Sequence, residues 1–140
     1  MTRARTFGRV TFVGRGKVGR ALAHAASEAG LEVDVVASRS RLRVRPSDLF
    51  VLTVADGAAR EVGARLDASG VEPSAVVHTA GILPPDHLAA MRARGWSVGQ
   101  AHPLVSFAGA RGAIPEGATV LVGGDRVAVA RAGRDAARAA

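Results

Sequence analysis

Gly14, Gly16 and Gly19 form a G-x-G-x-x-G pattern between an apolar segment, residues 9–13, and a segment with helical periodicity, residues 17–29. After a strand, Gly14 permits a sharp turn, Gly16 omits the Cβ that would keep a pyrophosphate from the backbone, and Gly19 lets the helix pack closely on the strand. The N–H groups that begin the helix would then face the phosphates. The pattern predicts a dinucleotide site, and the alternative is a glycine-rich turn without a ligand.

The second predicted strand, residues 32–37, ends in Ser38-Arg39-Ser40-Arg41. NAD sites carry a carboxylate here for the ribose hydroxyls, whereas an arginine favours the 2′-phosphate of NADP. Asp34 lies too early, inside the strand, where we expect a structural or exposed role. The predicted cofactor is therefore NADP, and the alternative is a solvated basic turn. The predicted cofactor-binding residues are Gly14, Arg15, Gly16, Lys17, Val18, Gly19, Ser38, Arg39, Ser40, Val54, Ala55 and Asp56.

The 140 residues carry a net charge of +7, and the excess lies in residues 1–45, which hold ten basic and three acidic side chains. Basic clusters attract the phosphates of cofactors and of nucleic acids alike. Aromatic residues make up 4% of the chain and tyrosine is absent, which disfavours base stacking. Nucleic-acid binding is therefore the weakest hypothesis, and a Tyr-x-x-x-Lys dehydrogenase mechanism is excluded.

The sequence contains no cysteine, which excludes disulfides, thiolate metal sites and a thiol nucleophile. No histidine pair has metal-ligand spacing, so we expect no metal. No apolar stretch is long enough to span a bilayer, and we see no signal peptide. The expectation is a cytoplasmic protein without a membrane partner.

Apolar segments alternate with helical patterns along the chain, which predicts an α/β fold of the Rossmann type with a doubly wound, mainly parallel sheet. We expect one dinucleotide-binding domain over residues 1–140 and no C-terminal helical domain. Asp56 is the expected N-cap of the second helix, and Gly95 is the expected end of the third. The predicted strands are residues 9–13, 32–37, 48–54, 75–78, 97–101 and 119–122, and the predicted helices are residues 17–29, 56–66, 85–94 and 125–140.

The crossover after the second predicted strand is shortened. A parallel crossover needs a dozen or more residues, yet only seven separate Ser40 from Asp48. Residues 41–45 alternate arginine with apolar side chains, the period of a strand. We expect a short extended edge segment folded back beside the second strand, where its arginines discourage edge-to-edge pairing. In the first helix, the expected apolar face consists of Val18, Leu22, Ala25, Ala26 and Ala29.

Five segments resemble, in the same order, a bacterial family of uncharacterised NADP-dependent oxidoreductase-like proteins. The family joins a Rossmann-like N-terminal domain to a helical C-terminal domain of unknown function. The segments are residues 10–19, 36–39, 52–56, 77–81 and 101–107, the last reading Ala-His-Pro-Leu-Val-Ser-Phe. More distantly, the chain is similar to pyrroline-carboxylate reductase, deazaflavin-dependent NADP reductases and prephenate dehydrogenase. It departs from the family at Val105, where glutamine is common, and at Ala55, where proline is common.

The resemblance implies that residues 54–56 run along the cofactor and that His78, Thr79 and His102 approach its nicotinamide. In prephenate dehydrogenases, the histidine of a comparable His-Pro segment handles the proton of the substrate hydroxyl. The resemblance thus makes His102 the candidate general acid or base, a role that suits its ordinary pKa. For His78 and for His102, the alternative to a catalytic role is that of a hydrogen-bonded structural residue.

Two functions stay open at this point. One is an NADP(H)-dependent oxidoreductase that transfers hydride with a small carbonyl, imine or hydroxy substrate, and the other is a non-catalytic NADP-binding or partner-binding module. Lys17 is the only lysine, so the catalytic lysine of β-hydroxyacid dehydrogenases has no counterpart. The expected partners are NADP(H), a small-molecule substrate, and a second copy or a partner subunit, since a surface that meets a second domain in the family would remain apolar.

Overall fold

The structure, a computed structural model, describes residues 8–39, 41–103 and 120–139. Its elements, with η marking a 3₁₀ helix, are β1 (Arg9–Val13), α1 (Lys17–Glu28), β2 (Glu32–Val36), β3 (Leu49–Leu52), η1 (Asp56–Ala58), α2 (Ala59–Ala68), β4 (Ala75–His78), η2 (Ala89–Arg94), β5 (Ser97–Pro103), β6 (Val120–Gly124) and α3 (Arg126–Ala139). All six predicted strands are found, with ends within two residues of the prediction. Within the described ranges, no helix is both long and apolar enough to cross a bilayer.

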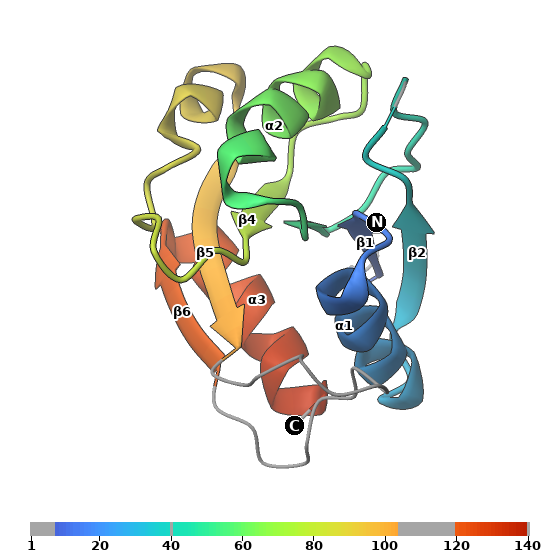
Figure 1. The fold of residues 1–140 in the computed structure, drawn as a ribbon. Coiled ribbons are helices and arrows are strands. Elements are labelled where there is room, and N and C mark those ends of the chain that lie inside the picture. The colour runs from blue at the N-terminus through green and yellow to red at the C-terminus, as the bar shows by residue number, and fades with distance from the viewer. Residues whose placement is uncertain (1–7, 40, 104–119, 140) are drawn as a thin grey trace, which may run out of the picture.

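The six strands form one sheet in the order β2-β1-β3-β4-β5-β6. The strands from β1 to β5 are parallel to their neighbours, and β6 is antiparallel to β5. The chain passes from β1 to β2 on one side and then returns past β1 to β3 on the other (Figure 1). This is the doubly wound α/β architecture of the Rossmann type, as predicted, and the reversal beside β1 is its topological switch point.

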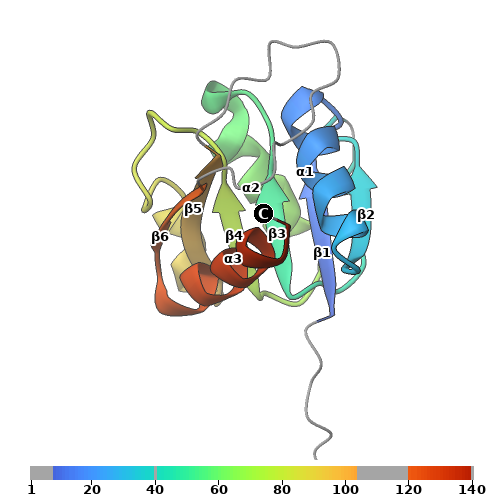
Figure 2. The same cartoon turned by 90° about the horizontal axis from the view of Figure 1, so that it is seen from below.

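Helices cover both faces of the sheet. α1 and α3 lie on one face, and α2 and η2 lie on the other (Figure 2). Successive side chains of β3 alternate between these layers, so that Leu49 and Val51 pack toward α1 and α3, and Phe50 and Leu52 pack toward α2. Because both faces are covered, β3 is buried along its whole length, which explains why residues 49–52 are continuously apolar.

The buried face of α1 agrees only in part with the predicted one. Its buried residues are Gly19, Ala21, Ala23 and Ala26, whereas Val18, Leu22, Ala25 and Ala29 of the predicted face are only half-buried. The helix approaches the glycine loop closely at Gly19, and this approach favours small side chains on the face toward the sheet. Hydrophobic periodicity weights large side chains, so it missed Gly19, Ala21 and Ala23, whereas Ala26 is confirmed and Leu22 packs against the core.

In the shortened crossover, the described residues 37–39 and 41–48 form no helix and no strand. Leu42 is buried and Val44 half-buried in the core beneath α2, while the arginines at 41, 43 and 45 are exposed, so the predicted alternation is confirmed without a strand ladder. Arg45 donates two hydrogen bonds to the Asp34 carboxylate on β2, at 2.6 and 2.9 Å. These bonds hold the pKa of Asp34 below its ordinary value and confirm a structural role for it. The segment therefore covers the β2 edge through side chains.

Two helices differ from the sequence-based expectation. Asp56 is not a helix N-cap: it begins η1, and α2 starts only at Ala59. The expected helix over residues 85–94 is a series of turns followed by η2, because the N–H groups of His87, Ala89 and Met91 each bond the carbonyl three residues back. Gly95 ends η2 with φ of +96°, as expected of a glycine in that place.

Candidate functional site

The glycine loop joins β1 to α1 at the switch point, and two of its glycines are fixed by packing. Gly14 has φ of +126°, and its N–H donates to the carbonyl of Val36 at the end of β2 (2.9 Å). A Cβ at Gly14 would collide with the Thr53 carbonyl oxygen, and a Cβ at Gly19 would collide with the Gly14 carbonyl oxygen. Both glycines are therefore required by the fold whether or not a ligand binds.

Gly16 is different, because nothing in the protein lies within 4 Å of the place where its Cβ would stand. Its backbone, with φ of −76° and ψ of −172°, is extended and open to any residue. Neither packing nor conformation requires a glycine at this position. A ligand that lies directly against the backbone would require one, since a Cβ would occupy its space.

Thr53 is a residue of this loop that the predicted cofactor set missed. Its side chain is buried, and its Oγ1 lies 3.2 Å from the carbonyl oxygens of both Val13 and Gly14, to which it donates. A Cβ at Gly19 would lie 2.5 Å from the same Oγ1. Thr53, directly after β3, therefore holds the loop by hydrogen bonds and contacts the start of α1 at Gly19. The only sequence signal was a hydroxyl at the end of an apolar strand.

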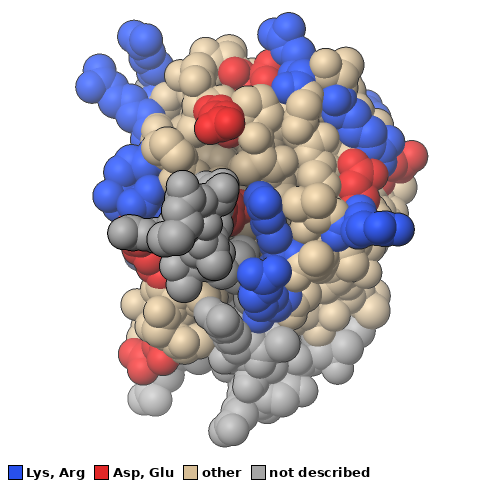
Figure 3. Space-filling view, turned by 180° about the vertical axis from the view of Figure 1, so that it is seen from behind, with Lys and Arg blue, Asp and Glu red and all other residues tan. Residues whose placement is uncertain are grey.

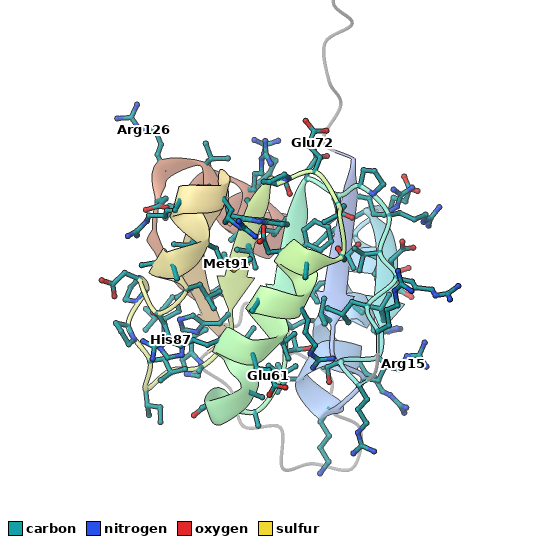
Figure 4. The ribbon with its side chains drawn as sticks, turned by 90° about the horizontal axis from the view of Figure 1, so that it is seen from above. Arg15, Glu61, Glu72, His87, Met91 and Arg126 are labelled. Atoms are coloured by element: carbon teal, nitrogen blue, oxygen red, sulfur yellow. The ribbon has the colours of Figure 1, made fainter. Side chains whose placement is uncertain are left out.

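The start of α1 offers unpaired backbone donors. Gly16 is its N-cap and makes no side-chain capping bond, and the first turn holds no acidic residue. Arg15 and Lys17 are exposed beside it, and Figure 4 shows Arg15 extending outward there. The N–H groups, the helix dipole and two cationic side chains together favour an anion at this end of α1.

The other predicted cofactor residues follow the carboxyl ends of β2 and β3, the two strands beside β1. Ser38 and Val54 are half-buried, and Arg39, Ala55 and Asp56 are exposed. Ser40 lies outside the described residues. Because neighbouring parallel strands end at the same edge of the sheet, the structure brings these segments together with the glycine loop at the switch point.

Several arginines form ion pairs with carboxylates away from this edge. Arg9 bonds Glu32 at 2.6 Å, Arg92 bonds Asp125 at 2.8 Å, and Arg94 bonds Asp67 at 2.7 Å. On the face that Figure 3 shows, Lys and Arg side chains stand in separate groups with Asp and Glu between them. This face therefore does not present the continuous basic surface that binding of a nucleic-acid backbone would favour.

His78 and His102 lie at the ends of the neighbouring strands β4 and β5 and both bond the backbone. The Nε2 atom of His78 donates to the carbonyl oxygen of Pro84 (2.8 Å), and its Nδ1 accepts from the N–H of Ala80 (3.2 Å). The Nδ1 atom of His102 donates to the carbonyl oxygen of Thr79 (2.8 Å). The three predicted catalytic residues therefore lie in one hydrogen-bonded group at the carboxyl ends of β4 and β5.

Two further residues shape this group, and neither was among the predicted site residues. Gln100 pairs with His78 in the sheet register, and its Nε2 donates to the carbonyl oxygens of Ala80 (2.6 Å) and Leu83 (3.0 Å). A Cβ at Gly81 would stand 2.6 Å from the Nε2 atom of His102, so the loop can pass over that ring only with a glycine there. Their roles depend on contacts across strands, which spacing along the chain does not reveal.

Burial lowers the pKa of His78, and the positive forms of His87 and His102 lower it further, while the hydrogen bond to Pro84 and the charge of Asp56 oppose the shift. The folded protein therefore binds a proton at His78 less readily than the unfolded chain, whose pKa is 6.5. Stability from this residue is complete above that value and is lost progressively as the pH falls from it toward the lower pKa of the folded state.

We expect the free energy of unfolding, measured by urea denaturation, to decrease as the pH falls from 7.5 to 5, by up to about 1.4 kcal/mol per pH unit from this group. The decrease should be smaller in a His78→Phe variant, which has no ring proton to bind. Parallel pH profiles for the two proteins would contradict this prediction.

The strand order and the glycine loop at the switch point define an α/β domain of the Rossmann type. Neither a protein-family model nor a curated protein matches the sequence. Solved structures do match. One is a protein from Bacteroides fragilis that is described as an NADP oxidoreductase (16% identity, TM-score 0.74). The others are 3-hydroxyisobutyrate dehydrogenase from Salmonella typhimurium (20% identity, TM-score 0.72) and an imine reductase from Bacillus cereus (20% identity, TM-score 0.69).

These alignments cover 94%, 95% and 94% of this chain but 57%, 54% and 52% of the three neighbours, respectively. The chain therefore spans just over half the length of the proteins it resembles. At these identities the likeness establishes the fold, and the activity must be argued from the site. The resemblance to one bacterial family, drawn from the sequence, stays a prediction.

Proposed function

We propose that this chain is an NADP(H)-binding domain of an oxidoreductase. The observation that carries the proposal is Gly16: an exposed glycine, in a backbone conformation open to all residues, with empty space where its side chain would be. It lies at the uncapped start of α1, where the pyrophosphate of a dinucleotide binds in this fold. Gly14, Gly19 and Thr53 hold that backbone in place for the ligand.

The other predicted cofactor-binding residues can be assigned binding roles that agree with their positions. Arg15, Lys17 and Val18 surround the start of α1, and the segment Val54–Asp56 would run along the ribose and pyrophosphate. Ser38 and Arg39 would bind the 2′-phosphate, together with Ser40, because Arg39 can bond a phosphate through two parallel N–H groups. Asp34 does not compete for the ribose hydroxyls, since Arg45 holds its carboxylate.

At the other end of the cofactor, Thr79 and His102 would face the nicotinamide and a small carbonyl, imine or hydroxy substrate. The cofactor supplies the hydride. His102, held through its Nδ1, would accept or donate the proton of the substrate at its other ring nitrogen. His78 has both ring nitrogens bonded to the backbone, so we assign it to holding the loop rather than to contact with substrate.

Calorimetric titration with NADPH, NADH and duplex DNA tests the proposal. We expect saturable binding of NADPH, weaker binding of NADH, and no DNA binding at physiological salt. An increase in the melting temperature with NADPH should accompany binding, since a ligand specific to the folded state stabilises it. If DNA bound with a steep salt dependence and NADPH did not bind, the nucleic-acid hypothesis would replace this one.

An Arg39→Ala variant should lose about tenfold to a hundredfold in NADPH affinity and little in NADH affinity, because a charge-assisted hydrogen bond contributes about 1.5–3 kcal/mol. The matched control is Arg126→Ala, which removes an exposed arginine on the far side of the molecule from Arg15 (Figure 4). Equal loss for both coenzymes would contradict the assignment of the 2′-phosphate to Arg39.

The second candidate is a module that binds NADP without turnover and joins a partner. It is favoured by the large apolar side chains Ile82 and Leu121, which are 83% and 52% exposed. Leu121 lies opposite His102 in the register of β5 and β6, so a second copy or a partner subunit could complete the site there. A screen of NADPH oxidation with small ketones and imines, with His102→Gln as the control, separates the two candidates.

A further inference from the structure

A single peptide group lies between the two histidine rings at the ends of β4 and β5. Its carbonyl, on Thr79, accepts a hydrogen bond from the Nδ1 of His102 at 2.8 Å. Its N–H, on Ala80, donates to the Nδ1 of His78 at 3.2 Å. Because a peptide group is planar and rigid, the direction of one bond determines the direction of the other.

The backbone partners determine which nitrogen of each ring carries the proton. A carbonyl oxygen only accepts, so His102 must carry its proton on Nδ1, which leaves the lone pair on Nε2. An amide N–H only donates, so the Nδ1 of His78 must be unprotonated and its proton lies on Nε2, which donates to the Pro84 carbonyl at 2.8 Å. The two rings therefore have opposite tautomers.

We propose that His78 is a positioning residue that fixes the tautomer of His102 through the peptide group between Thr79 and Ala80. The catalytic use of this tautomer rests on the proposed function, because a proton on Nδ1 leaves Nε2 of His102 as the atom that takes up the substrate proton. The hydrogen bonds that carry it are present without coenzyme and can be examined separately.

The surroundings of the loop make this coupling specific. Gln100 bonds the carbonyls of Ala80 and Leu83 and so anchors the loop after this peptide, whose own carbonyl and N–H bond His102 and His78. His78 is 1% exposed and stays neutral in this arrangement, because a proton on its Nδ1 would point at the N–H of Ala80. The charged and titratable groups that act on His78 are Asp56, His87 and His102.

The test is a long-range ¹H–¹⁵N spectrum of the histidine rings at pH 8, in the absence of coenzyme. Four histidines are present, and single His→Gln variants assign their signals. In the wild-type protein we expect His102 in the Nδ1–H form and His78 in the Nε2–H form. In His78→Phe, which retains a buried ring but cannot accept from Ala80, the Nδ1–H population of His102 should fall from about 90% to about half, the loss of roughly one hydrogen bond.

The matched variant is His78→Asn, whose side-chain oxygen can accept from the Ala80 N–H near the former position of Nδ1. We expect it to restore the wild-type tautomer of His102. Ser97→Ala controls for general destabilisation, because it removes a different hydrogen bond of β5, the one from the Ala128 N–H at 3.0 Å, and should leave His102 unchanged.

Two results would overturn the inference: a wild-type His102 with its proton on Nε2, or a folded His78→Phe variant with His102 unchanged. If the His78→Phe variant does not fold, the His78→Gln variant made for signal assignment replaces it, because its longer side chain does not place an acceptor at the Nδ1 position beside the Ala80 N–H. NADPH titration of the same samples reports separately on the proposed function. A chain that shows the opposite tautomers but binds no NADPH would retain the hydrogen-bonded link and lose its catalytic purpose.

Discussion

Replacing Gly14 with alanine is expected to lower the free energy of unfolding by about 3–5 kcal/mol, because two costs add. The first is backbone strain, since φ is +126° at this position. The second is a collision of the new Cβ with the Thr53 carbonyl oxygen and, at 2.7 Å, with the Thr53 Oγ1. Both Thr53 atoms belong to a residue that is itself bonded to the loop, so neither can withdraw cheaply.

Gly30 provides the matched control, because its φ is +88° and nothing lies within 4 Å of its Cβ position. A Gly30→Ala variant has the strain without the collision and should lose only about 1–2 kcal/mol. Chemical denaturation with both midpoint and slope measured distinguishes the two. Equal losses would show that the contact with Thr53 contributes nothing.

A Gly16→Val variant should lose about a hundredfold or more in NADPH affinity, because displacing the pyrophosphate from the backbone removes at least one or two charge-assisted hydrogen bonds of about 1.5–3 kcal/mol each. Its stability should change by no more than about 1 kcal/mol, since the extended backbone accepts valine and the space is empty. The combination of intact folding and lost binding is specific to a ligand site.

Gly133→Val is the control for this variant, because Gly133 also has empty space at its Cβ position but lies in α3, away from the glycine loop. It should bind NADPH like the wild-type protein. If Gly16→Val bound NADPH with unchanged affinity, the open space over Gly16 would have no role in binding. The proposed function would then lose its main support.

Local sequence patterns were enough to predict most helices and strands and the class of fold that they form. Residues 41–45 were predicted to form a short extended segment from their period of two, and the structure has that period as a buried Leu42 between exposed arginines. The predicted edge segment was correct in its course and wrong only in its strand character, because side-chain bonds such as Arg45 to Asp34 replace a backbone ladder. The end of η2 at Gly95 was likewise predicted from one residue.

Two predictions from local preference differ from the structure, and packing explains the one in α1. Asp56 is of a residue type that is common at the N-cap, yet it begins the short helix η1, and α2 starts three residues later. Periodicity missed Gly19, Ala21 and Ala23 on the buried face of α1, where close contact at Gly19 favours the smallest residues. At α1, contacts with the glycine loop and with Thr53 decided which face the helix buries.

The sequence by itself determined the glycine loop, the alternation of strands and helices, and therefore the edge of the sheet at which a ligand would bind. These properties follow from backbone conformation and hydrophobic period, which are encoded within a few residues. Only the tertiary structure separated Gly16, which the fold does not need, from Gly14 and Gly19, which it does. It alone placed Thr53 and Gln100 in the site and gave the rings of His78 and His102 their tautomers, because hydrogen bonds between separate strands fix the direction of each donor and acceptor.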